Sequence, residues 1–433
     1  QFEAQTSSIW PLAFPQITFT NSVRMDGDQS DDSLSRSISG VSTTKFSLSF
    51  WTKYAAVQGI GSEGPILFSS ENNSSDYITF QFNTSNQIDF SFQGTQNRRI
   101  TNRVFRDPSA FYHFLVVIDT TESTASDRLK IYVNGSQETS FATSTTNVSQ
   151  SANISPIDET LNYSIGRYNG QSSDFCYDGY FSEFIAVYGQ ALTPSSFGVF
   201  NTVSNIWEPR GYAGTYGTNG FRLNFSDSSN LGDDTSGNGN DFTVNNLTSI
   251  DQSTDTPSNN FCIFNPVDIP ANSSGSTGTI HDLSDGNLTL TNTNSAFREA
   301  RSTFYLTQGK WYWEAKSTRE GGSQSQVGVV LNNYSGGSGQ RRVYQHNAKK
   351  YDDGGSSDYG ATWTTNDIIG VALNLDDGEI TFYKNGSSQG VAFTDLLTSI
   401  DDTGWIPTFN SYNGDMSFNF GSPPYAISSG NAD

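Results

Sequence analysis

The chain has 433 residues, enough for two or three domains, because a single hydrophobic core stops growing at about 250 to 300 residues. It carries 44 acidic against 23 basic residues, and its formal net charge at pH 7 is -21. Such a surface repels phosphate backbones and anionic bilayers. The charge balance therefore argues against nucleic acid as a partner and favours divalent cations. No apolar run approaches the about 18 residues that a membrane span requires, so membrane insertion is not expected. The alternative is that the acidity only keeps a secreted or displayed protein soluble.

An alternation of large apolar and small polar residues begins at Phe46. In FSLSFW, the side chains of Phe46, Leu48 and Phe50 fall on one face of a strand. Short segments of the same kind follow with no helical period between them, which predicts an antiparallel β-sandwich. These segments are ILFSS from Ile66, YITFQF from Tyr77, IDFSF from Ile88 and FYHFLVVID from Phe111.

The same region continues with a hairpin and ends with a short helix. The alternating residues 129–133 lead into Asn134-Gly135, a dipeptide typical of a tight hairpin turn. DGYFSEFIAVYG begins at Asp178, and Thr193-Pro194 predicts the first turn of a short helix. The order of these motifs over residues 17–205 resembles the concanavalin A-like lectin/glucanase jelly roll of laminin-G-like and pentraxin-like domains. We therefore assign residues 1–205 to a first sandwich.

Residues 206–275 are predicted to be an ordered connector with a few short strands. Its stretch SDSSNLGDDTSGNGND offers many carboxylate and amide oxygens on a backbone that glycines allow to turn sharply, and such oxygens suit calcium. The spacing is not that of an EF-hand, and the alternative is a pair of Asx turns. Asp174 and Asp178 are a second candidate pair. The predicted calcium ligands are Asp227, Asp233, Asp234, Asn238, Asn240 and Asp241.

Residues 276–433 contain the clearest strand pattern. In NDIIGVALNLDDGEITFYKNG (366–386), apolar residues recur at every second position, Asp376-Asp377-Gly378 supplies a turn, and Asn385-Gly386 turns the chain again, which predicts a β-hairpin. Together with GKWYWE from Gly309 and MSFNFG from Met416, this order of motifs resembles a SPRY (B30.2-type) domain. The resemblance implies a two-sheet sandwich that recognises other molecules, mostly proteins, through loops at one end. The predicted fold class is all-β, with two antiparallel sandwiches in tandem.

The segment 332–358 is interpreted as a long polar loop. It concentrates cations and aromatic rings in a chain that is poor in bases, and this combination suits an anionic sugar or an acidic protein surface. The alternative is that these bases neutralise nearby aspartates such as Asp352 and Asp353. A similar basic patch follows IDFSFQG. The predicted ligand-binding residues are Arg341, Arg342, Tyr344, His346, Lys349, Lys350 and Tyr351, together with Arg98 and Arg99.

The concanavalin-like fold also hosts glycosidases, which need a pair of carboxylates on either side of the scissile sugar bond. The strands show no acid-x-acid pair, since Glu183, Glu314 and Glu379 stand singly among apolar neighbours. Three histidines are present, without a Gly-x-Ser-x-Gly or His-Glu-x-x-His motif. We therefore predict that the chain is not an enzyme. Cys176 and Cys262 are expected to be free thiols, and the alternative is a disulfide between them, which would require the two units to touch.

The combination of the two folds resembles fibre, spike or capsid-appendage proteins of marine bacteriophages and related viruses. That resemblance implies an extracellular protein on the virion surface that attaches to a host surface glycan or protein. It also implies contacts with other virion subunits, and a homo-oligomer is compatible with it. The alternatives are a purely structural virion or surface-layer subunit and a secreted polysaccharide hydrolase.

Overall fold

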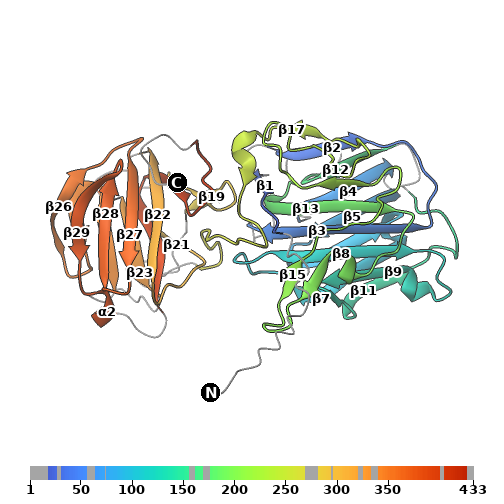
Figure 1. Ribbon diagram of the computed structural model, residues 1–433, viewed down its shortest axis with the longest axis horizontal. Coiled ribbons are helices and arrows are strands. Elements are labelled where there is room, and N and C mark those ends of the chain that lie inside the picture. The colour runs from blue at the N-terminus through green and yellow to red at the C-terminus, as the bar shows by residue number, and fades with distance from the viewer. Residues whose placement is uncertain are drawn as a thin grey trace, which may run out of the picture.

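The fold is all-β, as predicted. The computed structural model describes residues 18–26, 31–55, 64–73, 75–155, 161–168, 176–268, 281–293, 296–319, 325–332, 340–399 and 404–426. Figure 1 shows two β-sandwiches placed end to end along the long axis of the molecule. All strand pairs described are antiparallel. We call the N-terminal unit the first sandwich and the C-terminal unit the second sandwich.

The first sandwich consists of two facing sheets. In one sheet the strand order is β10 (Ser136–Gln137), β9 (Leu129–Val133), β8 (Tyr112–Asp119), β3 (Lys45–Tyr54), β13 (Asp178–Tyr188), β1 (Ser22–Asp26) and β18 (Gln252–Ser253), with β16 (Phe221–Leu223) also paired to β13. In the other it is β11 (Phe141–Thr146), β7 (Asn97–Val104), β6 (Gln87–Phe92), β5 (Asp76–Phe82), β4 (Ile66–Asn73), β12 (Asn162–Ile165), β2 (Ser33–Ser37) and β17 (Thr243–Asn245).

Aromatic rings fill the space between these two sheets. Phe50 lies at the centre of the core and is fully buried. Its ring centroid lies 4.7 Å from that of Phe184, 5.1 Å from that of Phe80, 5.8 Å from that of Phe114 and 5.9 Å from that of Phe181. The alternation of rings with serine and threonine in the sequence thus sends the rings inward and the small polar residues to the opposite face of each strand.

Three strands from the 206–275 segment belong to the sheets of the first sandwich. β16 pairs with β13, β17 pairs with β2, and β18 pairs with β1. Phe221, Leu223 and Phe225 are buried in the same core as Phe184. The packed structure of the first sandwich therefore continues to about residue 253.

Short helical turns and one small hairpin complete the first sandwich. The helix expected after Thr193 is a 3-10 helix. The hairpin formed by β14 (Gly198–Phe200) and β15 (Trp207–Pro209) follows it. The 3-10 helices of this region are η1 (Gly94–Gln96), η2 (Ala125–Arg128), η4 (Pro194–Ser196) and η5 (Ser249–Asp251).

The second sandwich has the same two-layer plan. One sheet has the order β19 (Asp282–Ser284), β20 (Thr289–Thr291), β31 (Asp415–Asn419), β22 (Lys310–Arg319), β27 (Ile368–Asn374), β28 (Glu379–Lys384) and β29 (Ser387–Phe393). The other has the order β21 (Phe297–Arg301), β30 (Trp405–Tyr412), β23 (Gln326–Leu331), β24 (Arg341–Gln345), β25 (Asn347–Tyr351) and β26 (Ser356–Thr362). A one-turn helix, α2 (Leu396–Ser399), lies at one end.

The hairpin predicted within residues 366–386 is confirmed. β27 and β28 pair in continuous register from Ile369 opposite Lys384 to Asn374 opposite Glu379. The next turn, between β28 and β29, has Asn385 at φ 49° and Gly386 at φ 78°. Asn134 and Gly135 have φ 46° and 78° in the first sandwich. Positive φ at both central residues matches the right-handed twist of the flanking strands, which explains why both turns use Asn-Gly.

Candidate functional site

The basic segment predicted to be a loop consists largely of strands. Within 340–358, β24 pairs with β23, β25 pairs with β24, and β26 begins at Ser356. The prediction of a continuous polar loop from 332 to 358 was therefore wrong. Strand pairing satisfies the backbone polar groups, and the long basic side chains find acidic or carbonyl partners contributed by other parts of the chain.

Arg341 and Arg342 are buried and paired. The guanidinium of Arg341 donates a hydrogen bond to Glu299 and lies 3.8 Å from a carboxylate oxygen of Asp353. Arg342 donates two hydrogen bonds to Asp395, at 2.9 and 2.6 Å. This pairing lowers the pKa of Asp395 below its usual value. Both charges are thus balanced mainly by Glu299 and Asp395 from other parts of the chain, and that of Arg341 also by Asp353 of the same segment.

Tyr344 and His346 belong to the interior of the second sandwich. The Tyr344 hydroxyl donates to the carbonyl of Ala361, and burial raises the pKa of Tyr344 to about 12. The imidazole of His346 lies 5.9 Å from Trp363, centroid to centroid, in an edge-to-face arrangement. Both residues are less than a tenth exposed.

The remaining residues of the basic segment are partly exposed. Lys349 forms an ion pair with Asp358 at 2.7 Å. The ammonium of Lys350 donates to the carbonyl of Ala392 and lies 4.9 Å from the ring centroid of Phe393. Burial raises the pKa of Tyr351. The structure therefore brings the predicted residues together on two strands, and Lys349, Lys350 and Tyr351 are the members of the set with solvent access.

Arg98 and Arg99 lie on β7 of the first sandwich. Arg98 binds the carboxylate of Asp89 through two guanidinium nitrogens. Arg99 donates to the carbonyl of Thr145 and to the hydroxyl of Thr146, each at 2.7 Å, and so ties β7 to β11. Burial lowers the pKa of Arg99. Both side chains thus have partners within the sandwich.

The acidic, glycine-rich stretch is a tightly hydrogen-bonded loop. Asp234 is its centre, since one carboxylate oxygen accepts the backbone N–H groups of Arg222 and Ser236, and the other accepts that of Asn240. Asn240 and Asn238 each donate to the carbonyl of Gly220 at 2.8 Å. These contacts give the stretch a fixed shape.

The other predicted calcium ligands surround this loop. Asp241 accepts the backbone N–H of Asp234 at 2.9 Å, and Asp227 accepts that of Ser229 at 2.8 Å. Neighbouring carboxylates and desolvation raise the pKa of Asp233, with desolvation the larger cause. Among the described residues, no three His, Cys, Asp or Glu side chains gather as metal ligands would. Asp174 lies outside the described residues, and Asp178 is buried on β13. Calcium at this loop stays a prediction.

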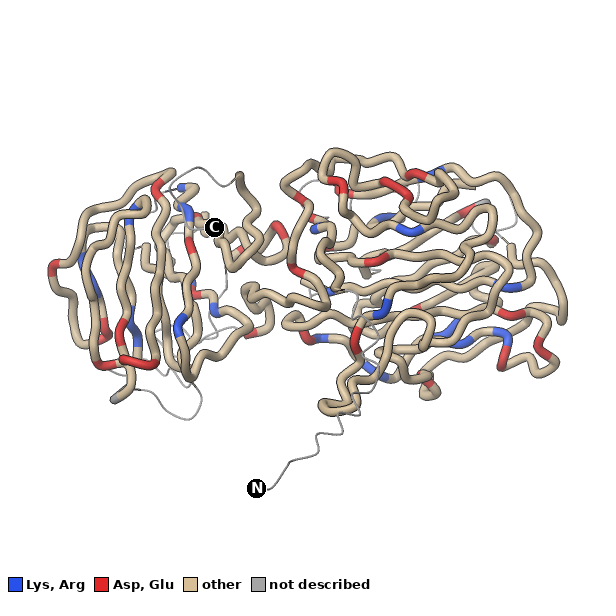
Figure 2. Tube along the Cα trace, in the orientation of Figure 1, with Lys and Arg blue, Asp and Glu red and all other residues tan. Residues whose placement is uncertain are grey.

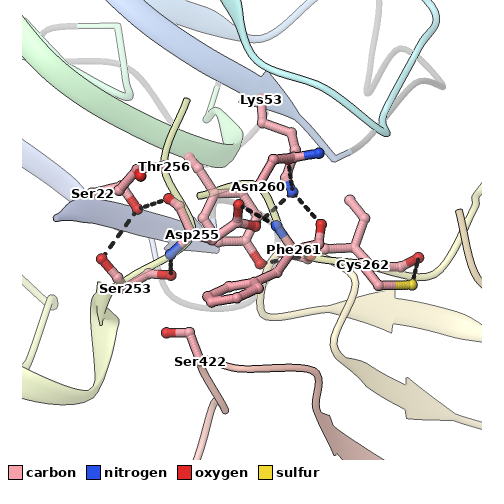
Figure 3. A network of polar contacts seen from close by, with 12 residues as sticks. Ser22, Lys53, Ser253, Asp255, Thr256, Asn260, Phe261, Cys262 and Ser422 are labelled. Atoms are coloured by element: carbon pink, nitrogen blue, oxygen red, sulfur yellow. Dashed lines mark hydrogen bonds and ion pairs between the residues drawn. The ribbon is translucent and has the colours of Figure 1, made fainter. Parts of the chain in front are cut away.

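The segment that joins the two sandwiches forms a buried site that sequence reasoning missed. Lys53, at the end of β3, is fully buried and forms an ion pair with Asp255 at 2.5 Å. Its ammonium also donates to the side-chain oxygen of Asn260 and to the carbonyl of Phe261, at 2.9 and 2.8 Å (Figure 3). Asp255 in turn accepts the backbone N–H of Phe261. The ammonium thus holds the joining segment against the first sandwich.

Apolar and polar contacts reach from this site into the second sandwich. Ile263 and Leu288 pack in one buried cluster with Trp51, Phe111 and Tyr180 of the first sandwich. The hydroxyl of Tyr180 donates to the carbonyl of Gly286 at 3.0 Å, and the Asn287 amide donates to the carbonyl of Ala55 at 2.9 Å. The two sandwiches therefore share a packed interface in addition to the covalent connection.

His113 anchors the β14–β15 hairpin to the first sandwich. Trp207 donates through its indole N–H to Nδ1 of His113 at 3.2 Å, and the His113 Nε2 lies 2.9 Å from the hydroxyl of Ser49. An imidazole that accepts at Nδ1 is neutral, and burial lowers the pKa of His113 to about 3. His281 in the second sandwich is similar, since burial lowers its pKa to about 3 and its Nε2 lies 2.9 Å from the Ser411 hydroxyl.

These two histidines predict a loss of stability in mild acid. The pKa of a histidine in the unfolded chain is about 6.5. Below that pH, both imidazoles bind a proton in the unfolded state but stay neutral in the folded state. The free energy of unfolding should fall by up to about 1.4 kcal/mol per pH unit for each histidine between pH 6.5 and 3. Urea unfolding at pH 7 and pH 5 measures this loss. His113→Gln should flatten the pH profile, and an unchanged profile would contradict the assignment.

Both cysteines are free and buried, as expected for the thiols of Cys176 and Cys262. Burial raises the pKa of Cys262 above its usual value. In the part of the chain that the structure describes, no helix is long and apolar enough to cross a membrane.

Two family models match separate parts of the chain. Residues 27–196 match the concanavalin A-like lectin/glucanases superfamily, and residues 310–423 match the SPRY domain. The chain therefore carries a concanavalin A-like domain and a SPRY domain. The concanavalin A-like match falls in the first sandwich and the SPRY match in the second, so both resemblances seen in the sequence are confirmed.

Curated relatives are similar over a short part of their length. E3 ubiquitin-protein ligase RKP of Arabidopsis thaliana is 30% identical over 141 residues, which is 30% of this chain and 10% of that protein. ATP-dependent RNA helicase Ddx1 of Drosophila melanogaster is 33% identical over 129 residues, which is 29% of this chain and 17% of that protein. The match thus spans less than a fifth of either relative.

Similar solved structures include a SPRY domain and a pentraxin. The SPRY domain of human HERC1 is 18% identical, with a TM-score of 0.27, and the match covers 31% of this chain and 89% of that one. A heptameric SAP-like pentraxin from Limulus polyphemus is 13% identical, with a TM-score of 0.30, and the match covers 40% of this chain and 78% of that one.

Proposed function

We propose that this chain is a non-enzymatic recognition protein, displayed on a virion surface as part of a fibre, spike or appendage, and that it attaches to a host surface glycan or protein. The observation that carries the proposal is the pairing of a concanavalin A-like domain with a SPRY domain, since domains of both kinds typically bind other molecules without catalysis. In Figure 2 basic residues are interspersed with acidic ones along the described trace, and together with the net charge of -21 this distribution disfavours nucleic acid as the ligand.

A glycan array probed with the full chain tests this proposal. Binding to a defined set of glycans is the expected result, and it should be measured in calcium and again in a chelator. Binding that is lost in the chelator would support calcium at Asp227, Asp233, Asp234, Asn238, Asn240 and Asp241. A complete lack of glycan binding, together with no binding to intact host cells, would overturn attachment.

A second candidate function, a structural subunit of a virion or surface layer, is favoured by the tip of the β14–β15 hairpin. Val203 and Ile206 are 94% and 62% exposed, and Val199 and Phe200 beside them are about two-fifths exposed. Exposed apolar side chains gathered on a rigid support are typical of protein contacts. If the chain is a structural subunit, Val203→Asp should prevent the chains from assembling with one another while leaving the monomer folded. Sedimentation of the purified chain and of the variant measures this difference.

A further inference from the structure

The outer face of the larger sheet of the second sandwich carries a strip of aromatic and small residues. In β22, β27 and β28, alternate residues point into the core, among them Trp313, Val371 and Phe382. The residues between them face outward. We call six outward-facing residues of these strands and of the neighbouring β29 the outer strip: Tyr312, Gly370, Ala372, Thr381, Tyr383 and Val391.

Strand register places these residues in two adjacent rows. Tyr312 lies opposite Ala372, Ala372 opposite Thr381, and Thr381 opposite Val391 of β29. In the next row Gly370 lies opposite Tyr383. The strands that carry these rows are side by side in Figure 1. The strip therefore has a floor of small side chains, with a tyrosine or valine at its margins.

The ring of Tyr312 is held in place while part of it remains in solvent. Its hydroxyl donates to the carboxylate of Glu314 at 3.0 Å, and the residue as a whole is 44% exposed. Glu314 is only 3% exposed. A Cβ atom at Gly370 would clash with the Tyr312 hydroxyl, so the glycine provides the space in which that hydroxyl lies. Burial and the carboxylate of Glu314 raise the pKa of Tyr312.

A second tyrosine of the strip lies close to Tyr312. The ring centroid of Tyr383 lies 6.3 Å from that of Tyr312, and the two planes are 76° apart. Val391, on the neighbouring strand, is 48% exposed. The rings of Tyr312 and Tyr383, with the small side chains of Ala372 and Thr381 beside them, offer an apolar surface that also carries hydroxyl groups.

We propose that the outer strip binds a neutral oligosaccharide, with sugar rings stacked on Tyr312 and Tyr383. This inference rests on the proposed function, and it adds the chemical class of the ligand and the surface that binds it. A sugar ring has an apolar face and a polar rim, which match a tyrosine face bordered by hydroxyl groups. The six residues of the strip are uncharged and provide no cation to pair with sialylated or sulfated glycans, so the complementary ligand is uncharged.

A bound peptide fits this surface less well. β22 pairs with β31 and β27, β27 with β22 and β28, and β28 with β27 and β29. The backbone N–H and C=O groups of the strands that carry Tyr312 and Tyr383 are therefore used within the sheet, and a peptide strand could not be added beside either ring; the edge strand β29 carries only Val391 of the strip. Recognition on the strip must come from ring faces and side-chain tips, which favours a saccharide.

The test measures binding of the full chain to immobilised neutral oligosaccharides, with sialylated and sulfated glycans on the same array. Tyr312→Ala and Tyr383→Ala should each weaken binding at least tenfold. Tyr312→Phe keeps the ring and should weaken it less than threefold. Tyr305→Ala is the matched control, because Tyr305 is 52% exposed but lies outside the strip, and it should leave binding unchanged.

The outcomes that contradict the strip can be told apart from those that contradict attachment. Neutral glycan binding that survives both alanine variants, with melting temperatures unchanged, would overturn the strip and leave attachment standing. Binding to acidic glycans alone, or to a peptide or protein ligand alone, would do the same. An absence of binding to glycans and to host cells would overturn both.

Discussion

Lys53→Met should destabilise the protein by about 3–5 kcal/mol, because it leaves the carboxylate of Asp255 buried without its cation. Lys53 is fully buried and Asp255 is 2% exposed, so water cannot take the place of the ammonium. Burial already raises the pKa of Asp255 despite the opposing effect of Lys53, which shows how costly that charge is to desolvate. Urea denaturation at pH 7 measures the loss.

A double variant separates the ion pair from simple packing. Lys53→Met combined with Asp255→Asn leaves no unpaired charge, so it should recover part of the stability lost in the single variant. Lys45→Met is a matched control, since Lys45 pairs with Asp119 at 3.0 Å but its side chain is 37% exposed, and it should cost less than about 1 kcal/mol. Equal losses in Lys45→Met and Lys53→Met would contradict the special role of the buried pair.

Phe50→Ala should cost about 3–5 kcal/mol through the cavity that it opens in the first sandwich. Phe50 is fully buried and touches aromatic rings from both sheets, so those rings cannot close the gap without leaving their own partners. Calorimetry should show the thermal transition of the first sandwich at a lower temperature.

Phe50→Leu provides the comparison, because it keeps much of the apolar volume and should be markedly milder than the alanine variant. The second sandwich offers an exposed counterpart in Phe297, which is 45% exposed. Phe297→Ala should change stability by less than about 1 kcal/mol. A small loss for Phe50→Ala would show that the core repacks around the missing ring.

The strands were predicted correctly where the alternation of apolar residues and the turn residues identified them within a short stretch of sequence. The hairpin within 366–386 has period-two apolar residues and Asn-Gly at its second turn, and both features are local. The aromatic strands around Phe50 followed from the same alternation. The alternation of Phe221, Leu223 and Phe225 was the signal that could have joined the 206–275 segment to the first sandwich.

The prediction for residues 332–358 failed because the partners of its charges are distant in sequence. Arg341 and Arg342 look like exposed cations in the sequence, but their carboxylates come from Glu299 and Asp395. Lys53 presents the same problem, since Asp255 lies about two hundred residues later along the chain. A sequence pattern shows which residues are close along the chain, whereas the partner in a buried ion pair depends on tertiary packing.

The interface formed by Ile263, Leu288, Tyr180 and the Lys53–Asp255 pair has a consequence for avidity. Two domains on a loose tether search a wide range of separations, so their second contact with a target carries an entropic penalty. Domains fixed by packing present their surfaces at one spacing and angle. A target that displays two epitopes at that spacing would be held cooperatively, and one with any other spacing would be held by a single domain at a time.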